Sequence, residues 1–199
     1  MNKKGKEKLR NLLIGAMLTA LGILIPLIMP VRVIIGPASF TLASHVPVMI
    51  AMFFSPFMAA MVALGTTFGF FLSIPVPTIW LRALSHVLFV LIGAYIMKKK
   101  PNLIKQKMKF QLFNFVLALI HSLAETAVVF GFYTLGFAHM DSASLFNLLL
   151  LIGIGGIVHS MIDMNIAFVL ANSLSKAFSI DVFENAKRHF TQNKKVKAI

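Results

Sequence analysis

Three clusters of positive charge, separated by long apolar stretches, constrain this chain more than any other feature. Seventeen of its nineteen Lys and Arg residues lie in clusters of five, six and six residues, at 3–10, 98–109 and 176–197. Cytoplasmic segments of membrane proteins carry an excess of Lys and Arg. The pattern therefore predicts an integral membrane protein whose two ends and one central loop lie in the cytoplasm.

The composition agrees with a membrane protein. Of 199 residues, 58% are hydrophobic and 13% are charged, with a mean hydropathy of +0.87, whereas soluble domains average about 25% charged residues. A net charge of +13 would suggest nucleic-acid binding if it were spread over a soluble surface. Because it is confined to the ends and one loop, the anionic inner leaflet of a bacterial plasma membrane is the expected partner, and no nucleic acid is. The absence of Cys excludes disulfides and thiolate metal sites.

The apolar stretches predict an all-α bundle of six transmembrane helices in one membrane domain, with both termini inside. Residues 1–29 resemble a signal peptide but are expected to remain as a first helix. Ser55-Pro56 divides the run 45–74, which is too long for one span and too short for two, so the second helix is expected to be short. The helices are expected at about 10–29, 45–54, 57–72, 78–97, 110–133 and 145–175, before a basic cytoplasmic tail at 176–199.

Two connecting segments are expected on the outer side of the membrane. Residues 31–44 are mixed in composition and contain Gly36 and Pro37, so an irregular loop is expected there. Residues 73–78 (SIPVPT) form a turn stiffened by two prolines.

Ionisable residues inside the predicted helices form three pairs at i,i+4 spacing, one pair on each of the last three helices. This spacing puts both members of a pair on one helix face. Ionisable groups are costly inside a bilayer, which makes each of them a functional candidate. The pairs are Arg82 with His86, His121 with Glu125, and His159 with Asp163.

The rise of the helices places most of these residues in the outer half of the membrane. At about 1.5 Å per residue, Arg82 lies about 6 Å below the outer end of its helix and Glu125 about 24 Å above the inner side. His159 falls near the midplane. We therefore expect a polar cavity that opens outward and is walled by three helices. The candidate contacts to a bound molecule are Arg82, His86, His121, Glu125, His159, Asn147, Trp80 and Arg32.

A structural role is the alternative for several of these residues. Arg82 and Glu125 could form a buried structural ion pair, and Arg32 could reach lipid headgroups. Trp80 is expected at the outer interface in any case. The glycines at 153, 155 and 156 suit helix packing as well as close approach of a ligand. Interhelical hydrogen bonds are the alternative role of His121, His159 and Asp163.

Metal binding and enzyme activity are the chemical alternatives. The two His–carboxylate pairs contain enough ligands for zinc or iron. Their spacing is unspecific, however, the pairs differ in depth, and Arg82 would repel a cation, so no metal or other cofactor is expected. No phosphate-binding Gly-rich loop, GxSxG or HExxH motif occurs. An enzyme is therefore not expected, although a small intramembrane enzyme that uses the His–carboxylate pairs remains a rival hypothesis.

The first helix contains an AxxxA pattern, Ala16-Met-Leu-Thr-Ala20, whose small face lets another helix approach closely. With about two hundred residues, six helices, a short second helix and basic cytoplasmic ends, the whole chain resembles the substrate-binding S components of energy-coupling-factor (ECF) vitamin transporters. The resemblance implies a protein that captures a vitamin from outside, with 31–44 as a lid. It also implies docking through Ala16 and Ala20 onto a membrane scaffold component that is coupled to two ATPase subunits.

The choice of vitamin depends on a looser similarity. The segments SFTLASHVPVMIAMFFSP, ALGTTFGFF and LRALSHV look similar to S components assigned to niacin. Nicotinate and pantothenate each carry one carboxylate, which an Arg side chain recognises with paired hydrogen bonds. Phe40, Phe70 and Trp80 could stack on an aromatic ring, which favours nicotinate. Pantothenate would instead use polar partners such as Asn147, His121 and Glu125.

Overall fold

The computed structural model describes residues 2–35, 38–73 and 76–187. Gly36 and Pro37 of the predicted loop, and the predicted basic tail beyond residue 187, lie outside the described residues. The elements are α1 (Lys3–Ile28), β1 (Arg32–Ile35), β2 (Ala38–Thr41), α2 (Val46–Phe54), α3 (Pro56–Ser73), α4 (Pro77–Lys99), the 3₁₀ turn η1 (Pro101–Lys105), α5 (Lys107–Thr134), α6 (Ser142–Leu150), the π-helical turn η2 (Leu151–Gly155) and α7 (Gly156–Leu174).

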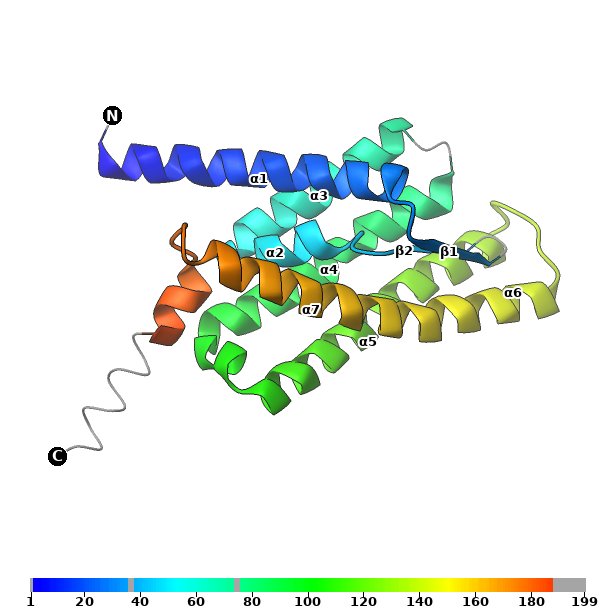
Figure 1. Ribbon diagram of the computed structural model, residues 1–199. Helices are drawn as coiled ribbons and strands as arrows, with labels where there is room; N and C mark the ends of the chain where they lie inside the picture. The colour runs from blue at the N-terminus through cyan, green and yellow to red at the C-terminus, as the bar shows by residue number, and fades with distance from the viewer. Residues whose placement is uncertain (1, 36–37, 74–75, 188–199) are drawn as a thin grey trace.

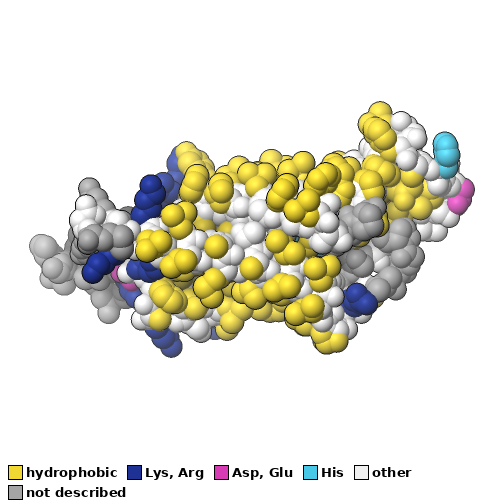
Figure 2. Space-filling view, turned by 90° about the horizontal axis from the view of Figure 1, so that it is seen from above, with side chains coloured by type: hydrophobic (Ala, Val, Ile, Leu, Met, Phe, Trp, Pro, Cys, Tyr) yellow, Lys and Arg dark blue, Asp and Glu magenta, His cyan; other side chains and the backbone are white. Residues whose placement is uncertain are grey.

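The helices form one elongated bundle (Figure 1), and hydrophobic side chains cover much of the middle of the face that Figure 2 shows. Among the described residues, five helical segments are long and apolar enough to cross a membrane: α1, α3, α4, α5 and the continuous run from α6 through η2 to α7. A spanning helix needs about 20 residues, so the nine residues of α2 are too few. The predicted class, a helical membrane protein, is confirmed.

Helix α2 lies at the centre of the bundle and positions the cavity described below. Pro47 near its start has no N–H to donate, and Ser55-Pro56 ends the helix because the residue before a proline avoids the helical conformation. All nine residues of α2 are buried, and it packs against α1, α3, α4 and α7. A short, fully buried helix of this kind holds its first residues at a fixed depth inside the bundle.

Small residues bring α1 and α3 into close contact. A Cβ atom added at Gly65 of α3 would lie 2.6 Å from Thr19 Cγ2 of α1, and one added at Gly22 would lie 3.3 Å from Thr66 Cγ2. Interfaces between membrane helices are enriched in small residues, because dispersion contacts rather than the hydrophobic effect hold helices together in lipid. This face of α1 is therefore occupied within the protein itself.

A β-hairpin replaces the irregular loop that we expected at 31–44. Strands β1 and β2 pair antiparallel, with Arg32 opposite Thr41 and Val33 opposite Phe40. The hairpin lies at the end of the bundle opposite to the start of α1 (Figure 1). It rests on η2, where a Cβ at Gly155 would meet Phe40 Cζ at 2.8 Å. The expectation was wrong because four-residue strands are too short to show an alternating pattern.

The chain after α7 turns back and packs against the core. Residues 181–187 are helical. The Phe183 ring lies 5.5 Å from the Phe53 ring of α2 and 6.1 Å from the Phe168 ring of α7. Lys105 Nζ of η1 donates a hydrogen bond to the carbonyl of Ala186 at 2.8 Å. The segment expected to be a basic tail thus contains a short amphipathic helix, whose buried residues Val182, Phe183 and Ala186 pack against this end of the bundle.

Candidate functional site

A small cavity of about 80 Å³ lies beneath the hairpin, between α2, α3, α4, α5 and α7. Pockets for drug-sized ligands measure about 300–1,000 Å³, so this cavity suits a molecule with a single small ring. Its polar lining comes from Thr41, Ser44, His45, Thr66, Arg82, His86, Glu125 and His159, and its aromatic lining from Phe40 and Phe70.

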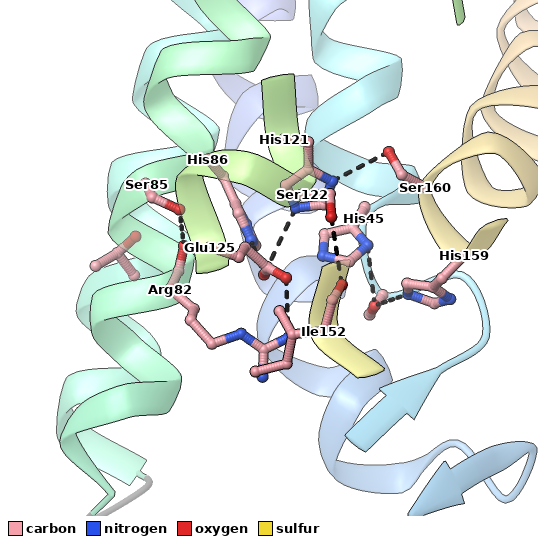
Figure 3. A network of polar contacts seen from close by, with 12 residues as sticks. His45, Arg82, Ser85, His86, His121, Ser122, Glu125, Ile152, His159 and Ser160 are labelled. Atoms are coloured by element: carbon pink, nitrogen blue, oxygen red, sulfur yellow. Dashed lines mark hydrogen bonds and ion pairs between the residues drawn. The ribbon is translucent and has the colours of Figure 1, made fainter. Parts of the chain in front are cut away.

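Glu125 of α5 is the centre of the first polar group in this site (Figure 3). Arg82 Nη2 donates to Glu125 Oε2 at 2.9 Å, and His86 Nε2 lies 3.0 Å from Oε1. His121 Nε2 lies 3.5 Å from the same Oε1, while its Nδ1 lies 3.0 Å from Ser160 Oγ. The carboxylate is buried, at 3% exposure. The polar pairs of two helices, α4 and α5, therefore meet at one buried acid, and Ser160 of α7 contacts it only through His121.

Asp163 of α7 is the centre of the second polar group. Its Oδ1 accepts the backbone N–H of Ala43 at 2.8 Å, and its Oδ2 accepts that of His45 at 2.9 Å. His45 Nδ1 lies 3.2 Å from Oδ2, and His159 Nε2 lies 3.4 Å from it. Ala43 has a φ of 65°, a backbone conformation that an alanine adopts only when surrounding contacts hold it there. Asp163 thus fixes the link between the hairpin and α2.

His45 joins the two groups into one network. Its ring centroid lies 4.8 Å from that of His86, 4.6 Å from that of His121 and 4.9 Å from that of His159. In Figure 3 its ring lies between Glu125 and His159. The sequence pattern marked His45 only as the start of the short second helix and did not predict its place in the site. A histidine at the first residue of a buried helix was the available signal.

Two buried donors on the cavity wall lack partners. Arg82 Nε and Thr66 Oγ1 have no hydrogen-bond partner among the described residues, and both side chains line the cavity. Buried polar atoms in proteins nearly always have a partner, so each exception needs an explanation. A polar group of a bound molecule would supply both partners.

Some of the predicted contact residues line the cavity, and others do not. Arg82, His86, Glu125 and His159 line it, and His121 lies directly behind Glu125. The lining found in the described residues does not include three predicted contacts. Trp80 packs edge-on against Phe71 with centroids 5.4 Å apart. Asn147 and Arg32 are exposed, on α6 and on the hairpin. Depth along the membrane placed these residues near the outer end, but it did not give the direction in which they point.

Replacement of Asp163 by Ala is expected to destabilise the protein by about 3 kcal/mol or more. The backbone N–H groups of Ala43 and His45 lose a charged acceptor, and hydrogen bonds to charged groups contribute about 1.5–3 kcal/mol each. Amide hydrogen exchange at 43–45 should accelerate, and the unfolding temperature in detergent should fall. The exposed Asp181 is the matched control, and its replacement by Ala should cost less than about 1 kcal/mol. Equal behaviour of the two variants would contradict the assigned role of Asp163.

These features define a multi-pass membrane protein that encloses a small polar cavity under a hairpin. The chain is similar to the niacin transporter NiaX of Lactococcus lactis subsp. cremoris (strain MG1363), with 62% identity over 198 residues, covering 100% of this chain and 89% of the relative. The chain therefore belongs to this transporter family, and its resemblance to the S components of ECF vitamin transporters is confirmed. No protein-family model and no solved structure matches the chain.

Membership in a transporter family also decides between the rival function classes. The relative is a transporter by name. The expectation that this chain is a transport protein and not an enzyme is confirmed by that relationship.

Proposed function

We propose that this chain is the membrane-embedded niacin-binding S component of an ECF-type vitamin importer. Two findings support the proposal: a relative that is 62% identical and named a niacin transporter, and a cavity with a guanidinium in its wall. The main support is the geometry of Arg82. Its Nη2 is paired with Glu125, while its Nε is buried without a partner among the described residues.

The cavity suggests how nicotinate binds. The carboxylate of nicotinate accepts hydrogen bonds from Arg82 Nε and Thr66 Oγ1, the two unpartnered donors, in an enclosed site where charge-assisted hydrogen bonds are strong. Phe40 and Phe70 supply apolar surface for the pyridine ring. Pantothenate, the alternative cargo, is longer and branched, and Asn147, one of its three expected partners, is exposed on α6.

The proposal includes a topology of six helices in one membrane domain, with both termini in the cytoplasm. Helix α1 begins and α7 ends at the same end of the bundle, and the hairpin lies at the other end (Figure 1). Lys and Arg side chains gather mainly at the first end (Figure 2). The positive-inside rule assigns that end to the cytoplasm, so the hairpin and the mouth of the cavity face outward.

The proposed partners are a membrane scaffold component and two ATPase subunits, which supply the energy for import. Ala16 and Ala20 are exposed on α1, on a face that the contacts with α3 leave free. Small exposed residues at this spacing let a second membrane helix approach closely. They form the proposed docking surface.

Calorimetric titration of the purified protein tests the proposed cargo. Nicotinate is expected to bind, and nicotinamide is expected to bind at least about 30-fold more weakly, because its neutral amide leaves part of the charge of Arg82 unmatched (about 2 kcal/mol). Pantothenate is the second competitor. Preferential binding of pantothenate, or equal binding of nicotinate and nicotinamide, would contradict a site built around the nicotinate carboxylate.

A further inference from the structure

Three histidines and one glutamate converge at the wall of the cavity in a way that the proposed function does not use. One potential ligand atom from each of His45, His86, His121 and Glu125 lies within 4.8 Å of the others. All four residues are buried. His45 directly precedes α2, His86 lies on α4, and His121 and Glu125 lie on α5. Zn–N bonds measure about 2.0–2.1 Å, so shifts of about 1 Å in these side chains would bring all four atoms to one ion.

The partners of these residues favour metal binding over a simple hydrogen-bond network. Ligands of metal ions in proteins are usually oriented by a second group bound to their other polar atom. His121 Nδ1 lies 3.0 Å from Ser160 Oγ, and His45 Nδ1 lies 3.2 Å from Asp163 Oδ2. An ionised carboxylate only accepts hydrogen bonds, so His45 Nδ1 carries the proton and its Nε2 retains a lone pair.

His121 supplies an independent sign that something is bound. Its Nε2 is buried and makes no hydrogen bond within the part of the chain that the structure describes. The side chain is 1% exposed, and this nitrogen is directed at Glu125 Oε1 from 3.5 Å. A buried imidazole nitrogen without a partner is costly. A metal ion between this nitrogen and Glu125 would satisfy both groups.

Arg82 does not prevent cation binding at this position. Its Nη2 contacts Oε2 of Glu125, which leaves Oε1 to the histidines. The guanidinium thus has the position of an outer partner that orients a carboxylate ligand, as Ser160 and Asp163 orient imidazoles. The difference in depth between the two His–carboxylate pairs does not bear on this site, because it uses only His121 and Glu125 of those pairs, with His45 and His86 as the further ligands.

The charge of the site gives a reason for a cation. With neutral imidazoles, Arg82 contributes +1 while Glu125 and Asp163 contribute −1 each, so the described groups around the cavity carry a net charge of −1. Entry of a nicotinate anion would make the net charge of this buried site −2, which is strongly unfavourable. A divalent cation would change the site to +1, and bound nicotinate would then make it neutral.

We propose that His45, His86, His121 and Glu125 bind one divalent transition-metal ion, of the kind typified by Zn²⁺, at the floor of the cavity. Imidazole and carboxylate ligands suit Zn²⁺, Co²⁺ and Ni²⁺. The ion lies beside the cargo cavity, because His45, His86 and Glu125 line it. Only the charge argument depends on the proposed function; the ligand geometry is independent of it.

The test uses untagged full-length protein, freed of metal by dialysis against a chelator and then titrated with Zn²⁺ in the absence of nicotinate. One Zn²⁺ per chain is expected by elemental analysis, and Co²⁺ in its place should give the absorption bands of a four-coordinate site. His121→Gln should weaken Zn²⁺ binding at least about 100-fold, and Ser160→Ala, which removes only an orienting group, about 10–100-fold. His139→Gln, at an exposed histidine, is the matched control and should bind Zn²⁺ unchanged.

The outcomes separate this proposal from the proposed function. Metal binding that depends on His121 and Ser160 but not on His139 supports the metal site. Should His121→Gln fail to fold, the affinity of the Ser160→Ala variant for Zn²⁺ is the deciding measurement. Absence of stoichiometric metal, or equal binding by all variants, overturns the metal site. Nicotinate binding by a protein that takes up no stoichiometric metal overturns the metal site and leaves the proposed niacin binding intact. Zn²⁺ binding without any nicotinate binding would support the metal site and reject the proposed cargo.

Discussion

Replacement of Arg82 by Gln is expected to weaken nicotinate binding by about 100-fold or more. The guanidinium lines the cavity, and loss of one partner of a buried, hydrogen-bonded charge pair costs about 2–5 kcal/mol. Each 1.4 kcal/mol corresponds to about tenfold in affinity. Calorimetric titration measures the change, and size-exclusion chromatography checks that the variant remains monodisperse.

The hairpin supplies a matched control for this experiment. Arg32→Gln removes the same charge from an exposed position on β1, and the affinity for nicotinate is expected to change less than about threefold. The rival hypothesis is that Arg82 serves only to neutralise Glu125. It would be favoured if Arg82→Gln unfolds while the double variant Arg82→Gln/Glu125→Gln folds and binds nicotinate normally.

The geometry of Arg82 leaves room for both roles that the sequence left open for it. Its Nη2 is paired with Glu125, as a structural ion pair requires, and its Nε remains without a described partner on the cavity wall. A guanidinium has five N–H donors, so one contact to a carboxylate leaves others for a ligand. The i,i+4 spacing predicted which helix faces are polar, but only the packing of α4 against α5 shows which atoms meet.

The helices were predictable because local sequence decides them. Long apolar runs and helix-breaking prolines define their ends, and five of the expected helices lie within three residues of those in the structure. The first helix begins earlier than expected, at Lys3, since charged residues at its start are compatible with a helix that extends beyond the membrane. Sequence periodicity could not reveal the π-helical turn η2, in which the carbonyl of Ile152 accepts a hydrogen bond from Ser122 Oγ.

The contacts that complete the site were not predictable from local patterns. His45 meets Asp163 across 118 positions of sequence, and Ser44 meets His159 across 115. No periodicity within one helix encodes such pairs, because they depend on how α2 inserts between the longer helices. The packed segment after α7 was not predicted for the same reason. Its neighbouring lysines suggested a solvated tail, and the contact between Phe183 and Phe53 joins residues that are distant in sequence.

Simultaneous replacement of Ala16 and Ala20 by Trp is expected to abolish nicotinate import while leaving nicotinate binding within about twofold of the original protein. Both residues are exposed on α1, and bulky side chains there would prevent the close approach of a partner helix. Pro26 is the residue of α1 that lines the cavity, and it lies about 9 Å along the helix from Ala20. Uptake of labelled nicotinate by cells that contain the scaffold and ATPase subunits measures import, and calorimetry on purified protein measures binding.

A bulky substitution elsewhere on the lipid-facing surface separates docking from a general effect on the membrane domain. Gly131 of α5 is suited to this, because a Cβ there would meet nothing within 4 Å in the described structure. Gly131→Trp is expected to preserve both binding and import. If the double Trp variant imports nicotinate at the original rate, the partner does not dock on this face of α1. If it loses binding as well, the substitutions act on the fold of the cavity, and the face must be tested instead with Ala16→Leu and Ala20→Leu singly.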